Sequence, residues 1–326
     1  MKLFLHVGPH KTATTLIQKT MLDNQKVLLD NNLFYPSKFI RIFGHHDLIN
    51  PIRNRQIHSE DISHLEKPEK NILLSSENLI NLEEDDFEYL KNALSNFEIN
   101  IIYCWRRATS KIFSIWQEIV KHGGTETFYQ FSFPHLAKTS KSATLSADLK
   151  LLMLERVFGN ASINIIDYDN SFINKDLIQQ FLKTLGIKSE LDIRIPYNDG
   201  TATNTALESH DVELIRALNV AFSKRKSIQG ASVRRAFILN LKKLNSDNLN
   251  ALRELIKSDK SEYYLESFDI DSRSEKIILD RFQKNITNYQ CITNIKKISI
   301  PTQNWLIDPN GSKMFEKLYQ ELSAFL

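Results

Sequence analysis

The feature that most constrains the fold is a series of short, uninterrupted apolar runs, each followed by a helical pattern. The runs predict strands at Leu3–Val7, Asn71–Ser75, Ile99–Trp105 and Ile163–Asp167. Continuous apolar sequence is typical of parallel strands that are buried on both faces. The intervening patterns predict helices at Thr14–Asn24, Glu84–Asn96, Thr109–His122 and Lys175–Leu185. This alternation indicates an α/β fold with a central parallel sheet flanked by helices.

The rest of the chain is expected to be irregular in two stretches and helical toward its end. Pro36–Lys70 and Gly123–Ser146 show no clear periodicity, and loops of that length are often functional. Helical patterns follow at Glu208–Phe222, Val233–Leu244, Asp247–Ser258, Ser274–Tyr289 and Lys313–Leu326. We expect one domain over residues 1–326, with an α/β core at 1–190 and a mostly helical cap at 207–326. The apolar face of the last helix favours packing on its own core, with a homodimer contact as the alternative.

Composition excludes several classes of protein. There are 42 Lys and Arg against 39 Asp and Glu, and a net charge of +3 is too balanced to predict nucleic-acid binding. No apolar run approaches the roughly 18 residues of a membrane-spanning helix, and Leu3–Val7 is too short for a signal-peptide core. Cys104 and Cys291 are too few for a disulfide framework and favour a reducing compartment. We therefore expect a soluble, cytoplasmic protein.

The first predicted strand runs into the sequence GPHKTATT, from Gly8 to Thr15, and a helix follows. This arrangement aims backbone N–H groups and a helix N-terminus at one point, which makes an anion site. Lys11 adds a positive charge, and three threonines add hydroxyl donors. An ATP-binding loop would need G-x-x-x-x-G-K-[ST], but Ala13 stands at the second glycine and no Gly-Lys pair follows. The segment predicts a phosphate loop and disfavours an ordinary NTPase; a capped helix with a surface lysine is the alternative.

This loop resembles the 5′-phosphosulfate loop of sulfotransferases that use 3′-phosphoadenosine 5′-phosphosulfate (PAPS), whose pattern is close to G-x-x-K-[TS]-[GA]-T-[TS]. Over about residues 1–190 the chain is similar to bacterial sulfotransferase-domain proteins of the carbohydrate type. The resemblance implies a P-loop-like three-layer fold, PAPS as the donor, adenosine 3′,5′-bisphosphate as the product, and no metal. Lys11 would bind the phosphosulfate and stabilise the leaving phosphate. The donor-binding residues that it implies in this loop are Gly8, His10, Lys11, Thr12, Ala13, Thr14 and Thr15.

A second signature follows the strand Ile99–Trp105. In sulfotransferases an arginine ends this strand, a serine follows eight residues later, and both bind the 3′-phosphate of the nucleotide. Arg106 and Ser114 have that spacing. A forked guanidinium suits a phosphate dianion, and a hydroxyl in the first turns of the adjoining helix can reach the same oxygens. Arg107 and Ser110 are the alternative register.

Sulfuryl transfer to an alcohol needs a general base near the acceptor hydroxyl. Glu77 comes two residues after the end of the strand Asn71–Ser75, so it should lie at the carboxyl edge of the sheet, beside the phosphate loop. A glutamate is the base in several carbohydrate and tyrosyl sulfotransferases, whereas a histidine serves in the small-molecule branch. We therefore rank Glu77 first and His46 or His45 second. The structural alternatives are a helix-capping role for Glu77 and a hydrated polar loop for the histidines.

Five basic residues lie close together in the sequence and predict a solvated basic face: Lys224, Arg225, Lys226, Arg234 and Arg235. The alternatives are that this cluster closes over the 3′-phosphate or that it lines a groove for an acidic glycan. The histidines lack the spacing of a metal site, so we expect no metal.

The favoured hypothesis is a PAPS-dependent sulfotransferase acting on a hydroxyl of a carbohydrate or small metabolite. A P-loop nucleotide kinase and a non-catalytic nucleotide- or glycan-binding module are the alternatives.

Overall fold

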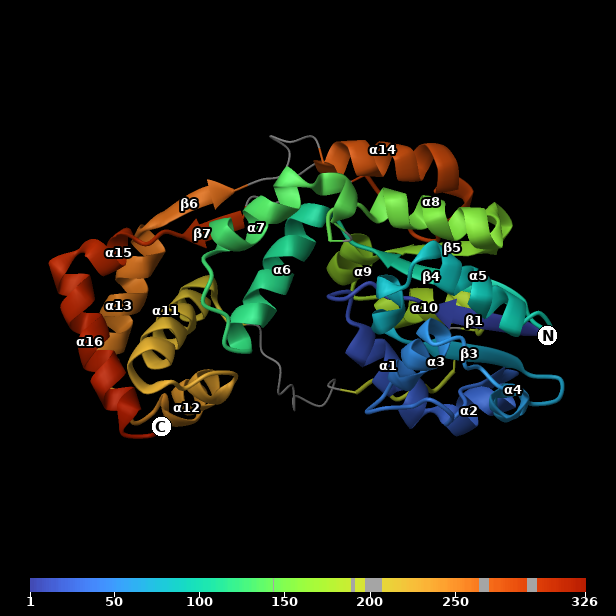
Figure 1. Cartoon of the computed structure of the whole chain (residues 1–326), viewed down its shortest axis with the longest axis horizontal. Helices are drawn as coiled ribbons and strands as arrows, with labels where there is room; N and C mark the ends of the chain where they lie inside the picture. Colours follow the sequence, from blue (N-terminus) through green and yellow to red (C-terminus); the bar gives the residue numbers. More distant parts are fainter. Residues whose placement is uncertain (143, 189–190, 197–206, 264–269, 292–297) are drawn as a thin grey trace. The chain divides into compact units, whose positions relative to one another are not determined.

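The computed structural model describes residues 1–142, 144–188, 191–196, 207–263, 270–291 and 298–326. The chain divides into two compact units, drawn together in Figure 1. The first unit comprises Met1–Ala108, Ser140–Thr203 and Asp269–Asn294. The second comprises Thr109–Thr139, Asn204–Phe268 and Ile295–Leu326. Each unit is therefore assembled from three separate stretches of the sequence.

The first unit is built on a five-stranded sheet in the order β2-β3-β1-β4-β5. The strands are β1 (Lys2–His6), β2 (Leu33–Phe34), β3 (Asn71–Ser75), β4 (Glu98–Trp105) and β5 (Ile163–Asp167). All neighbouring strands are parallel; in the register, Leu5 of β1 faces Leu74 of β3 and Ile101 of β4. The predicted α/β fold with a central parallel sheet is confirmed. Because β1 lies between β3 and β4, the carboxyl ends of these three strands meet at one edge.

Helices cover both faces of this sheet (Figure 1). They are α1 (Thr14–Asp23), α2 (Gln25–Asp30), α3 (Ile49–Arg53), α4 (Ser59–Leu65), α5 (Glu84–Ala93), α8 (Ala147–Phe158), α9 (Tyr168–Asn174), α10 (Leu177–Thr184) and α14 (Ile270–Phe282). Alternate residues of β1 enter two separate cores. Leu3 and Leu5 pack with side chains of α5, α8 and α14, whereas Phe4 packs with side chains of α1, α2 and α10. Burial on both faces explains why the strands read as continuous apolar runs.

Two sequence-based expectations about this unit need correction. Pro36–Lys70 is not irregular throughout, because it contains a 3-10 helix, η1 (His46–Leu48), and the helices α3 and α4. These helices have only five and seven residues, which is too short to produce a clear periodic pattern. The helix predicted to reach Tyr289 ends at Phe282. After this helix, the Thr287 amide donates to the Ile165 carbonyl oxygen at 3.0 Å, so the chain at Thr287 lies beside β5.

The second unit combines helices with a small antiparallel sheet. Its helices are α6 (Ala108–Lys121, which begins in the first unit), α7 (Phe128–Ala137), α11 (Ser209–Lys226), α12 (Ser232–Asn240), α13 (Ser246–Ser258), α15 (Asn304–Ile307) and α16 (Pro309–Ser323). Its sheet pairs β6 (Lys260–Tyr263) with β7 (Ile298–Pro301). The last helix, α16, packs within its own unit, with the rings of Tyr319 and Phe222 4.6 Å apart.

The sequence did not predict either α7 or the β6–β7 sheet. Pro134 lies inside α7, so this helix contains a residue that normally argues against one. A capping box at Thr127 and Gln130 fixes its start. The sequence of β6, KSEY, lacks the apolar character of a buried strand. The expectation of one domain with a core and a cap stays a prediction. The helix α14 lies in the part of the sequence that was expected to form the cap, but it packs beside α8 in the first unit.

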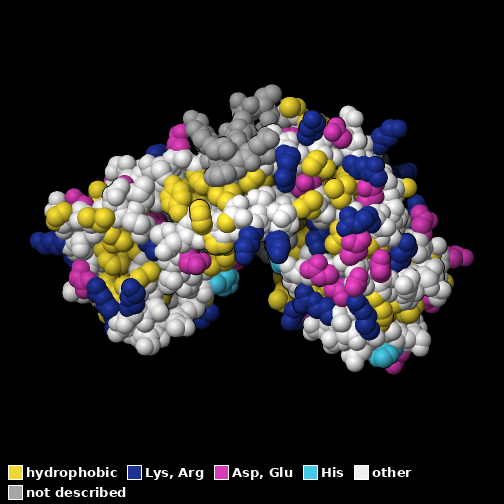
Figure 2. Space-filling model, turned by 45° about the horizontal axis from the view of Figure 1, so that its top comes forward, with side chains coloured by type: hydrophobic (Ala, Val, Ile, Leu, Met, Phe, Trp, Pro, Cys, Tyr) yellow, Lys and Arg dark blue, Asp and Glu magenta, His cyan; other side chains and the backbone are white. Residues whose placement is uncertain are grey.

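The surface of the sheet-bearing unit carries both signs of charge. In Figure 2 its acidic and basic side chains are interspersed over the visible face, in keeping with the small net charge. Among the helices that the structure describes, none has the length and hydrophobicity needed to cross a bilayer.

The start of α1 provides a test of the backbone geometry. Ala13, just before α1, has φ 55° and ψ 33°, a left-handed conformation that costs a residue with a Cβ about 1–2 kcal/mol. Ala13→Gly should therefore raise the free energy of unfolding by about 0.5–1 kcal/mol, after the entropy loss of glycine is counted. Denaturant titration measures this change. Ala217→Gly, the same substitution in the interior of α11, should instead lower stability by at least the same amount, and a loss in both variants would contradict the prediction.

Candidate functional site

The loop between β1 and α1 is tightly folded. Gly8, Lys11 and Ala13 all have positive φ angles, of 89°, 66° and 55°. The buried Thr12 hydroxyl donates to the Pro9 carbonyl oxygen at 2.7 Å, which fixes the turn from within. Ala13 is the N-cap of α1 and supplies no side-chain acceptor to its first turn. A loop of this shape, which leads into a helix N-terminus, suits a phosphate group.

The predicted loop residues differ in their accessibility. Thr12 and Thr14 are buried, His10 and Lys11 are half-buried, and Thr15 is exposed. Thr12 and Thr14 are therefore packed within the loop, and the Thr12 hydroxyl is already engaged by the Pro9 carbonyl oxygen. Lys11 lies in the loop itself, with a charge that raises the affinity of this site for anions.

Glu77 lies beside the phosphate loop, as its position after β3 predicts. A Cβ added to Gly8 would come within 3.0 Å of the Glu77 Cα, so a glycine is needed for this close approach. Glu77 opens the 3-10 helix η2 (Glu77–Asn81), but the N-cap is Ser76, whose Oγ accepts from the Asn78 amide at 3.3 Å. The capping role therefore belongs to Ser76. The Glu77 side chain instead accepts a hydrogen bond from Gln18, at 2.7 Å between Nε2 and Oε2.

His46 faces the same carboxylate. Its Nδ1 lies 2.9 Å from the Ser76 Oγ and 3.8 Å from the Glu77 Oε2. Burial raises the pKa of Glu77, but hydrogen bonds from Gln18 and its own amide, together with His46 and His10, outweigh burial and lower the pKa below its usual value. Glu77 is therefore a carboxylate at neutral pH, which is the form that can accept a proton.

His45 has a different environment from its neighbour. Its Nδ1 accepts from the Ser75 amide at 3.0 Å, and its Nε2 lies 2.9 Å from the Pro36 carbonyl oxygen, to which it donates. Burial is the main cause that lowers the pKa of His45 to about 4, so the ring stays neutral. Both ring nitrogens thus bind backbone and tie residues 36–45 to β3. Of the two histidines ranked as alternative bases, His46 is the one that contacts Glu77.

Arg106 leaves the end of β4 beside the phosphate loop. Its Nη1 donates to the Lys11 carbonyl oxygen at 2.5 Å, and its guanidinium lies 5.2 Å from the centre of the Tyr168 ring. Its Nε is 4.0 Å from the Asp169 Oδ1. The loop backbone and the tyrosine ring therefore hold Arg106 beside the loop between β1 and α1, and its role in binding a 3′-phosphate stays a prediction.

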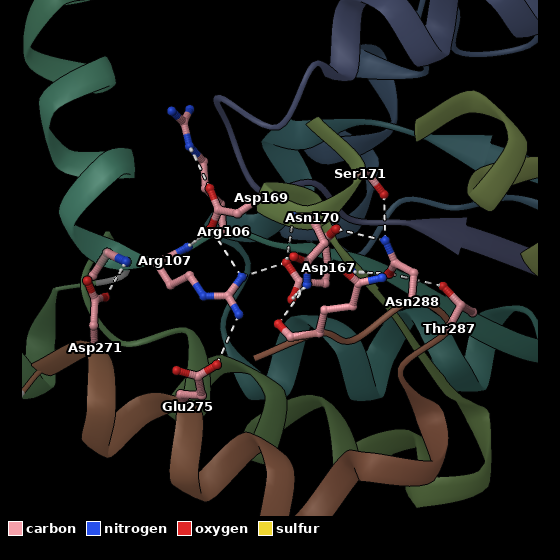
Figure 3. A network of polar contacts seen from close by, with 12 residues as sticks. Arg106, Arg107, Asp167, Asp169, Asn170, Ser171, Asp271, Glu275, Thr287 and Asn288 are labelled. Atoms are coloured by element: carbon pink, nitrogen blue, oxygen red, sulfur yellow. Dashed lines mark hydrogen bonds and ion pairs between the residues drawn. The ribbon is translucent and has the colours of Figure 1, made fainter. Parts of the chain in front are cut away.

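Arg107 points into a network of carboxylates (Figure 3). Its guanidinium lies 2.6 Å from Asp167 and 3.0 Å from Glu275, while its amide donates to Asp169 at 2.8 Å. It also stacks on Trp105 at 4.3 Å. Burial lowers the pKa of Arg107, but the three carboxylates outweigh burial, so its net pKa is raised. This network joins the end of β4 to β5, α9 and α14. Arg107 therefore has a structural role, whereas the alternative register assigns it to the 3′-phosphate.

Other predicted residues lie in the second unit. Ser110 and Ser114 are on α6, so their pairing with Arg107 or Arg106 stays a prediction. In the basic cluster, Arg225 forms an ion pair with Glu316 of α16 at 2.8 Å and stacks on Tyr319. An acidic residue that is distant in sequence therefore compensates part of this cluster.

The sequence did not identify Gln18, Tyr168 or Asp169 as residues of this site. A signal existed for Gln18, because a polar residue follows Ile17 on the buried face of a predicted helix. Asp169 and Tyr168 follow β5 directly, where residues at a strand end often bind ligands. In the parts of the chain that the structure describes, no group of three His, Cys, Asp or Glu side chains could hold a metal ion.

Comparison with solved structures gives a match at a distant level. It is a sulfotransferase from Alicyclobacillus acidocaldarius. The identity is 14% and the TM-score 0.42, and the match covers 72% of this chain and 99% of that one. No family model matches the chain, and no curated protein matches it. The function is therefore inferred from the residues of the site.

The two neighbouring arginines should respond differently to substitution. Arg107→Ala leaves the buried Asp167 carboxylate without its cation and should lower the free energy of unfolding by roughly 3–5 kcal/mol. Arg106→Ala removes a hydrogen bond to the loop and a contact with the Tyr168 ring but leaves no fully buried carboxylate without its cation, so it should cost less, about 2 kcal/mol. Denaturant titration of both variants measures the difference. Equal losses would contradict the division between a structural arginine and an anion-binding one.

Proposed function

We propose that this protein transfers a sulfuryl group from PAPS to a hydroxyl group of an acceptor. The observation that carries this proposal is the convergence of three parts at adjacent strand ends. The phosphate loop with Lys11 follows β1, Arg106 follows β4 and contacts that loop, and Glu77 follows β3 and contacts it from the other side. Two cations and one carboxylate around an anion loop are the groups that this reaction requires.

The residues of the loop fit a phosphosulfate group. Gly8 presents no side chain, the first turn of α1 receives no side-chain cap from Ala13, and Lys11 supplies the positive charge. The loop lacks the Gly-Lys pair of an ATP-binding loop, which favours PAPS over a nucleoside triphosphate. Arg106, with Ser114 as its predicted partner, would bind the 3′-phosphate.

In the proposed reaction the acceptor oxygen attacks the sulfur atom while the bond between sulfur and the bridging phosphate oxygen breaks. Adenosine 3′,5′-bisphosphate leaves with the negative charge of that oxygen, and Lys11 stabilises it. Glu77, which is ionised at neutral pH, takes the proton of the acceptor hydroxyl. His46 is the alternative base, since its ring lies 3.8 Å from the same carboxylate.

The acceptor class is proposed from the sequence resemblance, and the compartment from the low cysteine content. Similarity of residues 1–190 to bacterial proteins of the carbohydrate type supports a hydroxyl of a surface polysaccharide, a glycolipid or a small metabolite as the acceptor. A cytoplasmic location, where PAPS would be available, is part of the same proposal.

Nucleotide binding gives the first test. Adenosine 3′,5′-bisphosphate should raise the melting temperature of the protein more than ATP with magnesium does, because the site combines a phosphosulfate loop with a separate arginine for the 3′-phosphate. A thermal-shift titration measures both, and Arg106→Ala should weaken bisphosphate binding by roughly ten- to hundredfold. A larger shift with magnesium ATP would sink the proposal and support the nucleotide kinase.

Kinetics separate the roles of Lys11 and Glu77. Lys11→Ala should lower turnover even with saturating PAPS, because it removes a charge that acts on the leaving group. Glu77→Gln keeps the shape of the side chain but cannot accept a proton, so transfer should drop by about 10²–10⁴-fold while PAPS affinity is kept. Labelled PAPS with a panel of carbohydrate and small-molecule acceptors measures both rates.

His46→Ala is the control for the assignment of the base. If Glu77→Gln kept near-normal turnover while His46→Ala lost it, the base would be His46. Binding of the bisphosphate without transfer to any acceptor would support a non-catalytic binding module instead.

A further inference from the structure

Gln18 is a buried polar side chain that has no role in the proposed reaction as described above. It is 2% exposed and lies on α1 beside the fully buried Ile17 and Met21. A buried carboxamide is costly unless it forms hydrogen bonds. The Gln18 Nε2 donates to the Glu77 Oε2 at 2.7 Å, across 59 residues of sequence. The helix that leaves the phosphate loop therefore also holds the carboxylate beside that loop.

Gly44 provides the space for this carboxamide. A Cβ added to Gly44 would lie 2.5 Å from the Gln18 Cδ and 2.7 Å from both Nε2 and Oε1, which is far inside contact distance. The backbone of Gly44 is held in place, because its carbonyl oxygen accepts from the amides of Arg41 and His46. The next residue, His45, donates its amide to the Ser75 carbonyl oxygen of β3 at 2.7 Å. Gln18 is thus confined between a fixed backbone and Glu77.

We propose that Gln18 is a positioning residue for Glu77, and that Gly44 is required because only a residue without a side chain leaves room for the Gln18 carboxamide. The inference rests on the proposed function, in which Glu77 is the base. It adds two residues that neither the loop pattern nor the strand-end pattern contains.

The role of this hydrogen bond depends on the groups around the carboxylate. His46 and His10 attract the Glu77 carboxylate, and the buried side chains of His6 and Tyr35 lie close enough to interact with its charge. The Glu77 Oε2 that accepts from Gln18 is also the oxygen 3.8 Å from the His46 Nδ1. By donating to this oxygen, the buried Gln18 carboxamide fixes the orientation of the carboxylate and stabilises its ionised form.

The first test needs neither donor nor acceptor. In carbon-13 NMR titrations of the protein alone, with the Glu77 signal assigned through Glu77→Gln, Gln18→Ala should move the pKa of Glu77 upward, because a donor to the ionised form is lost. Gly44→Ala should do the same, since the flexible Gln18 side chain is the group that must move. In the double variant Gly44→Ala should add nothing, because its target is gone. Gln18→Leu, which keeps the volume, replaces Gln18→Ala if that variant does not fold.

Gln25→Ala is the matched control. It removes a glutamine that donates to the Tyr35 carbonyl oxygen at 2.9 Å in the same unit and does not contact Glu77. It should leave the pKa of Glu77 unchanged.

The second test is kinetic. Gln18→Ala and Gly44→Ala should each lower kcat by roughly tenfold, the effect of losing one hydrogen bond to a charged group, with the KM for PAPS unchanged. The acidic limb of the pH–rate profile should move to higher pH, because Glu77 is protonated sooner as the pH falls. A Glu77 pKa that does not move in either single variant, or effects of the two substitutions that simply add, would overturn the inference. If no PAPS-dependent transfer occurs, the proposed function fails, while the NMR result still decides the Gln18–Glu77 coupling.

Discussion

The parallel pairing of β1 with both β3 and β4 is the constraint on which the site depends. Each of these strands is buried on both faces, so none can shift its register without exposing apolar side chains of one core. Their shared direction brings three unrelated chain segments to one edge: the phosphate loop, the Ser76–Glu77 turn and the Arg106–Arg107 pair. The chemistry of the site is therefore set by the residues at the end of each strand, rather than by any single motif.

Two adjacent arginines at the end of β4 have different surroundings. Arg107 is surrounded by carboxylates from β5, α9 and α14, which balance its charge within the unit (Figure 3). Arg106 contacts a carbonyl oxygen and an aromatic face, and its Nε is 4.0 Å from the Asp169 carboxylate. The Asp167 carboxylate therefore lies closer to the Arg107 guanidinium than the Asp169 carboxylate lies to the Arg106 Nε.

Sequence reasoning succeeded where a local pattern reflects the structure directly. The bounds of β3 and β5 are as predicted, and those of β1 and β4 differ by one residue, because doubly buried strands leave an uninterrupted apolar signature. Glu77 was placed correctly beside the loop because parallel strands end together. The distinction between His45 and His46 could not be predicted, since it depends on which ring meets backbone atoms of β3 and Pro36. The Gly44–Gln18 contact was equally hidden, because it joins two segments that no periodicity relates.

The first unit is completed by a segment that is synthesised late. Its sheet is finished when β5 ends at Asp167, but α14, which buries Ile278 and Phe282 in one of the two cores, begins only at Ile270. During synthesis on the ribosome, the intervening residues of the second unit emerge before that core is closed. Until then, one face of the sheet keeps apolar side chains accessible, and exposed surface of this kind promotes misassembly. A cut after β5 would therefore leave the first unit without α14, and no single cut in the chain separates the two units.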